Sequence, residues 1–139
     1  MYHTLHSLPL RKAWESICLS SLVILCAACH KETKAERYAR EAKETTAQCP
    51  MAIDANTVMD SMTYTPSNHR LTYYYKVNGV ADSVLTDNAE MLRQQILERL
   101  LNATDMIPYI QDGVTFRYVY RTDTTAEPVM DFVYDSLKR

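Results

Sequence analysis

The chain has 139 residues, with 15 lysine and arginine side chains, 17 aspartate and glutamate side chains and a formal net charge of −2 at pH 7. This slightly acidic balance argues against nucleic acid as a partner, because binding to phosphate backbones requires a basic face. The chain contains only two glycines, which excludes a glycine-rich loop that cradles phosphate groups.

The first 30 residues carry the pattern of a bacterial lipoprotein signal. Arg11 and Lys12 precede an apolar run over residues 17–28, and the run ends in two alanines followed by Cys29. A run of this length matches the core of a signal peptide and is too short for a transmembrane helix, which needs about 20 apolar residues. We therefore predict that residues 1–28 are a signal peptide; ordinary secretion with cleavage nearby is the alternative.

In this interpretation Cys29 is the lipidation site and carries acyl chains such as palmitate, which attach the mature protein to a membrane. Position 30 is histidine and not the aspartate of an inner-membrane retention signal, which favours the outer membrane and leaves its periplasmic or external side open. Cys18 and Cys26 leave with the signal, so Cys49 has no partner for an internal disulfide. Such a thiol is either buried or available for an intermolecular bridge.

The next segment, 29–48, is predicted to be a lipidated tether with a charged helix. Thr33 and Glu36 are spaced as a capping box at the start of this helix, and its narrow stripe of alanine and Tyr38 favours a solvated spacer. A coiled segment that binds a partner is the alternative. Proline disfavours helical geometry in the residue before it, so Cys49-Pro50 ends the helix.

Residues 49–139 are predicted to form one small α+β domain. Alternating apolar residues indicate strands, and apolar residues repeated every three or four positions indicate helices. The expected elements after the tether helix are strands over 57–65 and 71–77, a long helix over 87–103, a short helical turn over 105–111, and strands over 114–121 and 129–134. The order α-β-β-α-β-β predicts an antiparallel sheet of two hairpins covered on one face by the long amphipathic helix.

Candidate catalytic residues are few. The mature chain has two histidines, His30 and His69, and neither stands in metal-ligand spacing, so no metal and no cofactor are expected. Asp54 and Asp60 could form a carboxylate pair for glycoside chemistry, and an enzyme acting on cell-wall glycan would need a cleft that joins them or His69. Side-chain bonds to the backbone at a strand entrance are the simpler role for Asp54.

Tyrosine is the one residue type in surplus, with ten in the chain. Strand alternation places Tyr73, Tyr75, Tyr118 and Tyr120 on the inward face, where their rings fill a core. The opposite face is then expected to carry an aromatic and basic surface that binds an envelope protein or a glycan. Its predicted members are Tyr64, Tyr74, Arg117 and Arg121.

Three segments, 49–61, 71–75 and 113–120, resemble a widespread group of small, uncharacterised bacterial envelope proteins and lipoproteins. The shared pattern is Pro-x-x-Ile-Asp, then Thr-x-Leu-Asp-Ser with Met59 in place of leucine, then Tyr-x-Tyr, then Gly-Val-x-Phe-x-Tyr-x-Tyr. The three residues 30–32 also resemble the export signal of Bacteroidetes surface lipoproteins. The resemblance implies an envelope location and brings no activity, substrate or cofactor.

These observations favour a non-enzymatic lipoprotein of the outer membrane that binds or supports an envelope partner. The alternatives are an envelope enzyme that acts on cell-wall glycan and an inhibitor or immunity-like factor. A deep polar pocket would favour the enzyme, whereas an exposed aromatic surface would favour binding.

Overall fold

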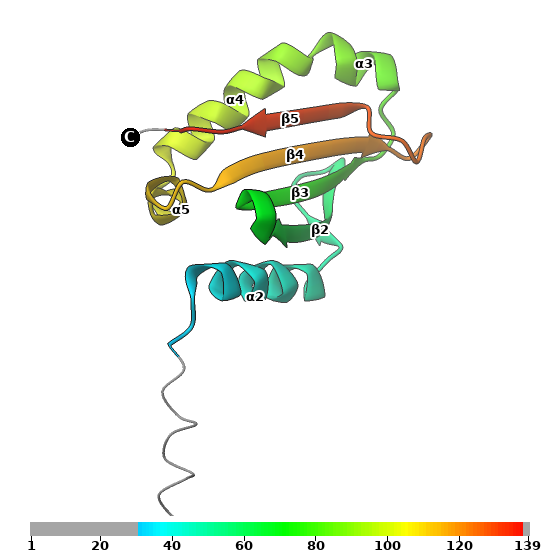
Figure 1. Ribbon diagram of the computed structural model, residues 1–139. Helices are drawn as coiled ribbons and strands as arrows, with labels where there is room; N and C mark the ends of the chain where they lie inside the picture. The colour runs from blue at the N-terminus through cyan, green and yellow to red at the C-terminus, as the bar shows by residue number, and fades with distance from the viewer. Residues whose placement is uncertain (1–30, 138–139) are drawn as a thin grey trace, which may run out of the picture. The chain divides into compact units, whose positions relative to one another are not determined.

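The computed structural model describes residues 31–137 of the chain. The predicted signal peptide, 1–28, and the predicted lipidation site, Cys29, lie outside the described residues. From Thr33 onward the chain forms a compact unit with the predicted α+β architecture (Figure 1). Between residues 31 and 137, no helix combines the length and the hydropathy that crossing a bilayer requires.

A single five-stranded sheet organises this unit. The strands lie in the order β1-β2-β3-β4-β5; β3 and β4 are parallel, and the other neighbouring pairs are antiparallel. Their bounds are β1 Met51–Ala52, β2 Thr57–Thr65, β3 Arg70–Val77, β4 Thr115–Thr122 and β5 Met130–Tyr134. The predicted strands are therefore present, whereas β1 was not predicted.

The prediction of a fully antiparallel sheet is wrong at its centre, where β3 and β4 run in the same direction. The cause is the connection between them. Its main helix, α4 (Ala89–Asn102), is about 21 Å long at 1.5 Å per residue, which carries the chain back along most of the length of the sheet. The next strand then starts at the same end as β3, and such a return is what parallel pairing requires.

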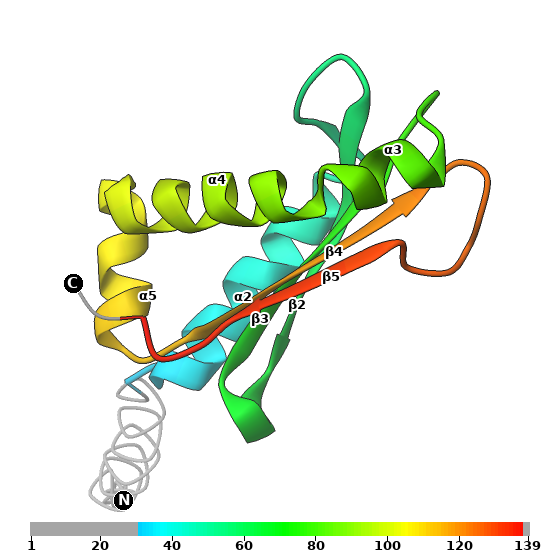
Figure 2. The same ribbon diagram turned by 90° about the horizontal axis from the view of Figure 1, so that it is seen from above.

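The remaining helices are α2 (Lys34–Ala47), α3 (Asp82–Asp87), α5 (Ile107–Gln111) and the 3-10 turns η2 (Pro66–Asn68) and η3 (Thr104–Met106). The predicted helix over 87–103 begins later than expected, because the chain first forms α3 and then restarts at Asn88 without a side-chain cap. Figure 2 shows α2 and α4 on the same side of the sheet, and both contribute to one buried cluster with it.

Helix α2 is part of this core and not a solvated spacer. Its Tyr38 is 0% exposed and its Ala42 is 3% exposed, and the Thr46 hydroxyl bonds both the carbonyl and the N–H of Met62 in β2, at 2.6 and 2.9 Å. The predicted capping box at Thr33 and Glu36 is confirmed. The interpretation of residues 33–48 as a solvated tether is therefore wrong. The alanine stripe is narrow, but one tyrosine adds enough apolar area to pack the helix against the sheet.

Candidate functional site

The sheet face under the helices carries a stack of tyrosine rings. The register of the parallel pair places Tyr73 beside Tyr118 and Tyr75 beside Tyr120. The ring centroids of these two pairs are 4.9 and 5.0 Å apart, and Tyr75 also stacks on Tyr118 at 6.1 Å with nearly parallel planes. We call these four residues the tyrosine ladder. Its rings cover one another's faces, so the ladder presents ring edges and hydroxyl groups.

The hydroxyl groups of the ladder have no hydrogen-bond partner among the described residues. Other tyrosines do have one: Tyr134 donates to the carbonyl of Arg93 at 2.8 Å. The ladder hydroxyls are also accessible to solvent. In the described chain, the side-chain nitrogen or oxygen atoms that are fully buried and have no partner belong to two arginines, and no ladder hydroxyl is among them. The ladder therefore offers open hydrogen-bonding groups to any molecule that approaches it.

These hydroxyl groups stay protonated at neutral pH. Burial raises the pKa of Tyr75 to about 12, and burial likewise raises the pKa values of Tyr73, Tyr118 and Tyr120. A neutral phenol both donates and accepts a hydrogen bond. The ladder can accordingly donate to carbonyl or carboxylate oxygens of a ligand.

Three ladder tyrosines line a groove of about 460 Å³ between the sheet and α4. This volume falls within the range of ligand sites, about 300–1,000 Å³. The helical wall is mostly apolar and includes Leu85, Leu92, Ile96, Leu100 and Met106. The segment that joins β1 to β2 contributes Ile53 and Asp54, and the first residue of β2 contributes Thr57. We call this cavity the tyrosine groove.

Three charged side chains also line the tyrosine groove: Arg99, Asp54 and Asp105. Arg99 lowers the pKa of Tyr75 and of Tyr120 by its positive charge, although burial outweighs this effect. Asp54 is engaged, since its Oδ1 accepts backbone N–H bonds from Asn56 and Thr57 at 2.9 and 2.8 Å. These two bonds lower the pKa of the Asp54 carboxyl group.

The predicted partner surface is not one surface. Tyr64 lies opposite Leu71 in the register and contacts Tyr38 on the face that the helices cover, whereas Tyr74, Arg117 and Arg121 lie on the other face. The cause is a bulge between Met59 and Ser61. One extra residue reverses which side chains of the strand point inward, and no alternation rule applied to β2 alone detects it.

Both arginines of the opposite face are already paired. Arg117 donates to both carboxylate oxygens of Asp131, at 2.5 to 3.2 Å, and Arg121 donates to Asp60 at 2.6 Å. The bond from Arg117 lowers the pKa of Asp131. A ligand on this face would have to compete with these ion pairs, so the face is a weaker candidate than the tyrosine groove.

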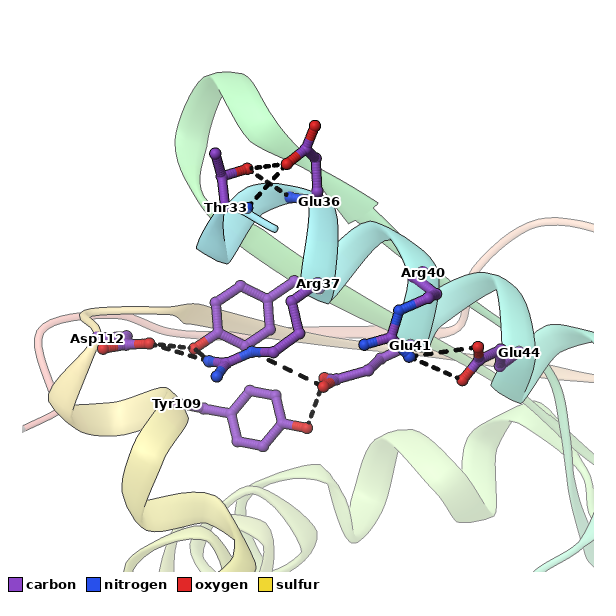
Figure 3. A network of polar contacts seen from close by, with 9 residues as sticks. Thr33, Glu36, Arg37, Arg40, Glu41, Glu44, Tyr109 and Asp112 are labelled. Atoms are coloured by element: carbon purple, nitrogen blue, oxygen red, sulfur yellow. Dashed lines mark hydrogen bonds and ion pairs between the residues drawn. The ribbon is translucent and has the colours of Figure 1, made fainter. Parts of the chain in front are cut away.

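Asp112 organises a second polar cluster, which joins α2 to the end of α5 (Figure 3). Its carboxylate accepts from Lys34 at 2.5 Å, from Arg37 at 3.2 Å and from the Tyr38 hydroxyl at 2.5 Å. The bonds from Lys34 and Tyr38 lower the pKa of Asp112. Burial, followed by the bond to Asp112, raises the pKa of Tyr38 to about 12.

His69 extends this cluster to the hairpin between β2 and β3. Its Nε2 lies 3.0 Å from the carbonyl oxygen of Asp112, and its Nδ1 lies 2.6 Å from the hydroxyl of Tyr64. Because a carbonyl can only accept, Nε2 is the donor in its contact with Asp112. Every partner here belongs to the fold, so we assign the cluster a structural role.

The three candidate catalytic residues do not lie in one cleft. Asp54 lines the tyrosine groove, Asp60 pairs with Arg121 on the opposite face, and His69 is bound within the Asp112 cluster. Within residues 31–137 no group of three or more histidine, cysteine or acidic side chains is placed to hold a metal ion. Cys49 is a half-buried free thiol whose Sγ lies 3.4 Å from the carbonyl of Thr45.

Comparison with known proteins assigns the chain to a family. Residues 33–130 match the profile of a domain of unknown function, DUF8479, and the chain belongs to that family. The match begins at the cap of α2, which agrees with the burial of this helix in the domain. No curated protein matches the chain significantly.

Three solved structures share the fold. A Pseudomonas aeruginosa protein described as secreted is 19% identical with a TM-score of 0.64, over 73% of this chain and 88% of its own. The type II secretion pilotin EpsS of Vibrio vulnificus is 12% identical with a TM-score of 0.55, over 73% and 87%. The pilotin AspS of Vibrio cholerae is 13% identical with a TM-score of 0.53, over 73% and 88%. At these identities the likeness shows the fold alone.

Proposed function

We propose that this chain is a non-enzymatic module of the bacterial cell envelope that holds a peptide segment of a partner protein in the tyrosine groove. A lipid on Cys29 attaches it to the outer membrane. Two of the three similar structures are pilotins of type II secretion systems and the third is described as secreted, which supports an envelope role. The lipoprotein pattern of residues 17–29 supports the anchor.

The observation that carries the proposal is the set of unpartnered hydroxyl groups in a mostly apolar groove. A hydroxyl group that loses water without gaining a hydrogen bond is unfavourable by roughly 1–3 kcal/mol, so a suitable occupant supplies acceptors along the groove. Tyr118 and Tyr120 alternate on β4, and alternate residues of a strand are about 6.6 Å apart. Alternate carbonyl groups of an extended peptide repeat at the same spacing.

The ring arrangement argues against a glycan as the occupant. Sugars bind to the open faces of aromatic rings, and the faces in the tyrosine ladder are covered by their neighbours at about 5 Å. A peptide with apolar side chains fits the walls formed by Leu92, Ile96 and Leu100. The partner is therefore assigned as a protein.

Site-specific photocrosslinking in cells that produce the full chain tests this proposal. A photoreactive phenylalanine analogue at Gln95 lines the tyrosine groove, and the same analogue at Val133, which is 40% exposed opposite Arg117 on the other face, is the matched control. We expect an adduct from Gln95 that maps to one short apolar segment of a partner and disappears when Leu92→Trp fills the groove. Adducts from Val133 alone would refute the proposal.

The anchor has its own test, because the groove and the lipid are independent parts of the proposal. Metabolic labelling with an alkyne analogue of palmitate should tag the natural chain and leave a Cys29→Ser variant unlabelled. A natural chain that stays unlabelled, or that keeps its first 28 residues in an intact-mass measurement, would remove the anchor from the proposal.

A further inference from the structure

The tyrosine groove contains three side chains whose hydrogen-bond donors have no acceptor among the described residues. Tyr75 and Tyr120 lie side by side in the register of the parallel pair, and their rings stack with their centroids 5.0 Å apart at 17° between planes. Arg99, on α4, lines the same groove, and its charge acts on both phenols. Arg99 has no ion pair among the described residues.

This pattern contrasts with that of Arg117 and Arg121 on the opposite face, where each arginine has a carboxylate partner within 2.6 Å. Asp54 is the carboxylate in the groove that also acts on Tyr120. Its Oδ1 is held by two backbone N–H groups of its own loop, and no bond joins it to Arg99. No carboxylate among the described residues therefore bonds Arg99 or the hydroxyls of Tyr75 and Tyr120.

We propose that Arg99, Tyr75 and Tyr120 form a receptor for a carboxylate, and that the segment held in the groove carries an acidic side chain at this point. A guanidinium group and two phenol hydroxyls all donate to carboxylate oxygens, and charge-assisted bonds of this kind are about twice as strong as neutral ones. This inference rests on the proposed function, since it specifies the chemistry of the segment that the groove binds.

Arg99 is the one basic side chain among the described residues that line the groove, beside the carboxylates of Asp54 and Asp105. Asp105, with Glu41, also raises the pKa of Tyr73, where burial is the main cause. A segment whose acidic residue meets Arg99 is therefore favoured to carry a basic residue where it passes Asp105.

A fatty acid also combines an apolar body with a carboxylate, and the groove distinguishes it from a peptide. Besides Arg99 and the two phenols, the polar side chains of Tyr118, Gln95 and Asp105 line the same cavity. A hydrocarbon chain would cover these polar groups without bonding them, which is unfavourable. A peptide has polar backbone atoms along its whole length, so we assign the carboxylate to a peptide.

Selection from a library of random 12-residue peptides displayed on phage tests this inference with the full chain purified in detergent. We expect peptides enriched on the natural chain to carry aspartate or glutamate beside apolar residues. An Arg99→Glu variant should bind these peptides at least about tenfold more weakly and select lysine or arginine instead. Arg93→Glu reverses an exposed charge on the same helix outside the groove and should change neither result.

The outcomes separate the inference from the proposed function. Peptides that require the groove, as judged by their loss in Leu92→Trp, but that show no acidic preference would overturn the carboxylate receptor and leave the binding function standing. If no enriched peptide requires the groove, both fall. Binding of dansyl-undecanoate that depends on Arg99, without any acidic preference among peptides, would overturn the assignment to a peptide.

Discussion

Tyr38 offers the sharpest test of how α2 belongs to the domain. Its side chain is 0% exposed, its ring lies 5.2 to 5.7 Å from those of Tyr64, His69 and Tyr109, and its hydroxyl donates to Asp112. Replacing a buried aromatic residue with alanine destabilises a protein by about 3–5 kcal/mol. For a unit of this size each kcal/mol lowers Tm by about 4–8 °C, so Tyr38→Ala should lower Tm by at least about 12 °C.

Two further variants measure the part of this loss that comes from the hydroxyl group and provide a control. Tyr38→Phe keeps the ring and removes the bond to Asp112, and a bond to a charged acceptor contributes about 1.5–3 kcal/mol. Lys43→Ala alters an exposed position of the same helix and should stay within about 0.5 kcal/mol of the natural protein. Thermal unfolding followed by circular dichroism measures all three. If Tyr38→Ala melts within about 2 °C of Lys43→Ala, α2 is a spacer after all and the assigned packing is wrong.

Three other changes have defined outcomes. Tyr118→Phe removes an unpartnered hydroxyl and should keep or raise Tm in thermal unfolding. Tyr134→Phe removes the bond to the carbonyl of Arg93 and should lower the free energy of unfolding by about 1 kcal/mol. An equal loss of stability in the two variants would contradict the unpaired ladder. The pKa of Tyr75 is raised to about 12 in the folded protein from about 10 in the unfolded chain. The stability that the protonated Tyr75 side chain contributes is therefore fully present below pH 10 and is lost as the pH rises through 12. Ultraviolet titration of tyrosinate in the folded protein should show this late ionisation, and complete ionisation near pH 10 would contradict the burial of the ladder. Gly113 has φ of 73°, so Gly113→Ala should destabilise by about 1–2 kcal/mol through backbone strain in urea unfolding, and an unchanged midpoint would remove this requirement.

Local patterns predicted most of the elements but not how distant ones meet. Alternation placed β3 and β4 correctly, and with them the four inward tyrosines, because side chains in an unbroken strand alternate strictly. The same rule failed in β2, where the bulge between Met59 and Ser61 moved Tyr64 to the covered face. A bulge depends on pairing with another strand, so one strand's residues do not reveal it.

The candidate site was only partly predictable for the same reason. The inward rings are expected to fill a core, but only Tyr120 is buried, and Tyr73, Tyr75 and Tyr118 are half-buried. The groove above them depends on where α4 crosses the sheet, which places Arg99 near Tyr75 and Tyr120. The paired state of Arg117 and Arg121 likewise depends on Asp131 and Asp60 in neighbouring strands. Strand pairing and helix placement are tertiary properties that periodicity does not encode.

The most direct test of the account is the affinity of the crosslinked partner segment for a double variant, Tyr75→Phe with Tyr120→Phe. Isothermal titration calorimetry measures this affinity, and Tyr74→Phe on the opposite face is the control. The account predicts that the double variant binds at least about tenfold more weakly, since two hydrogen bonds of roughly 1 kcal/mol each are lost, while its Tm does not fall. Unchanged affinity of the double variant, or an equal loss in Tyr74→Phe, would contradict recognition by the groove hydroxyls.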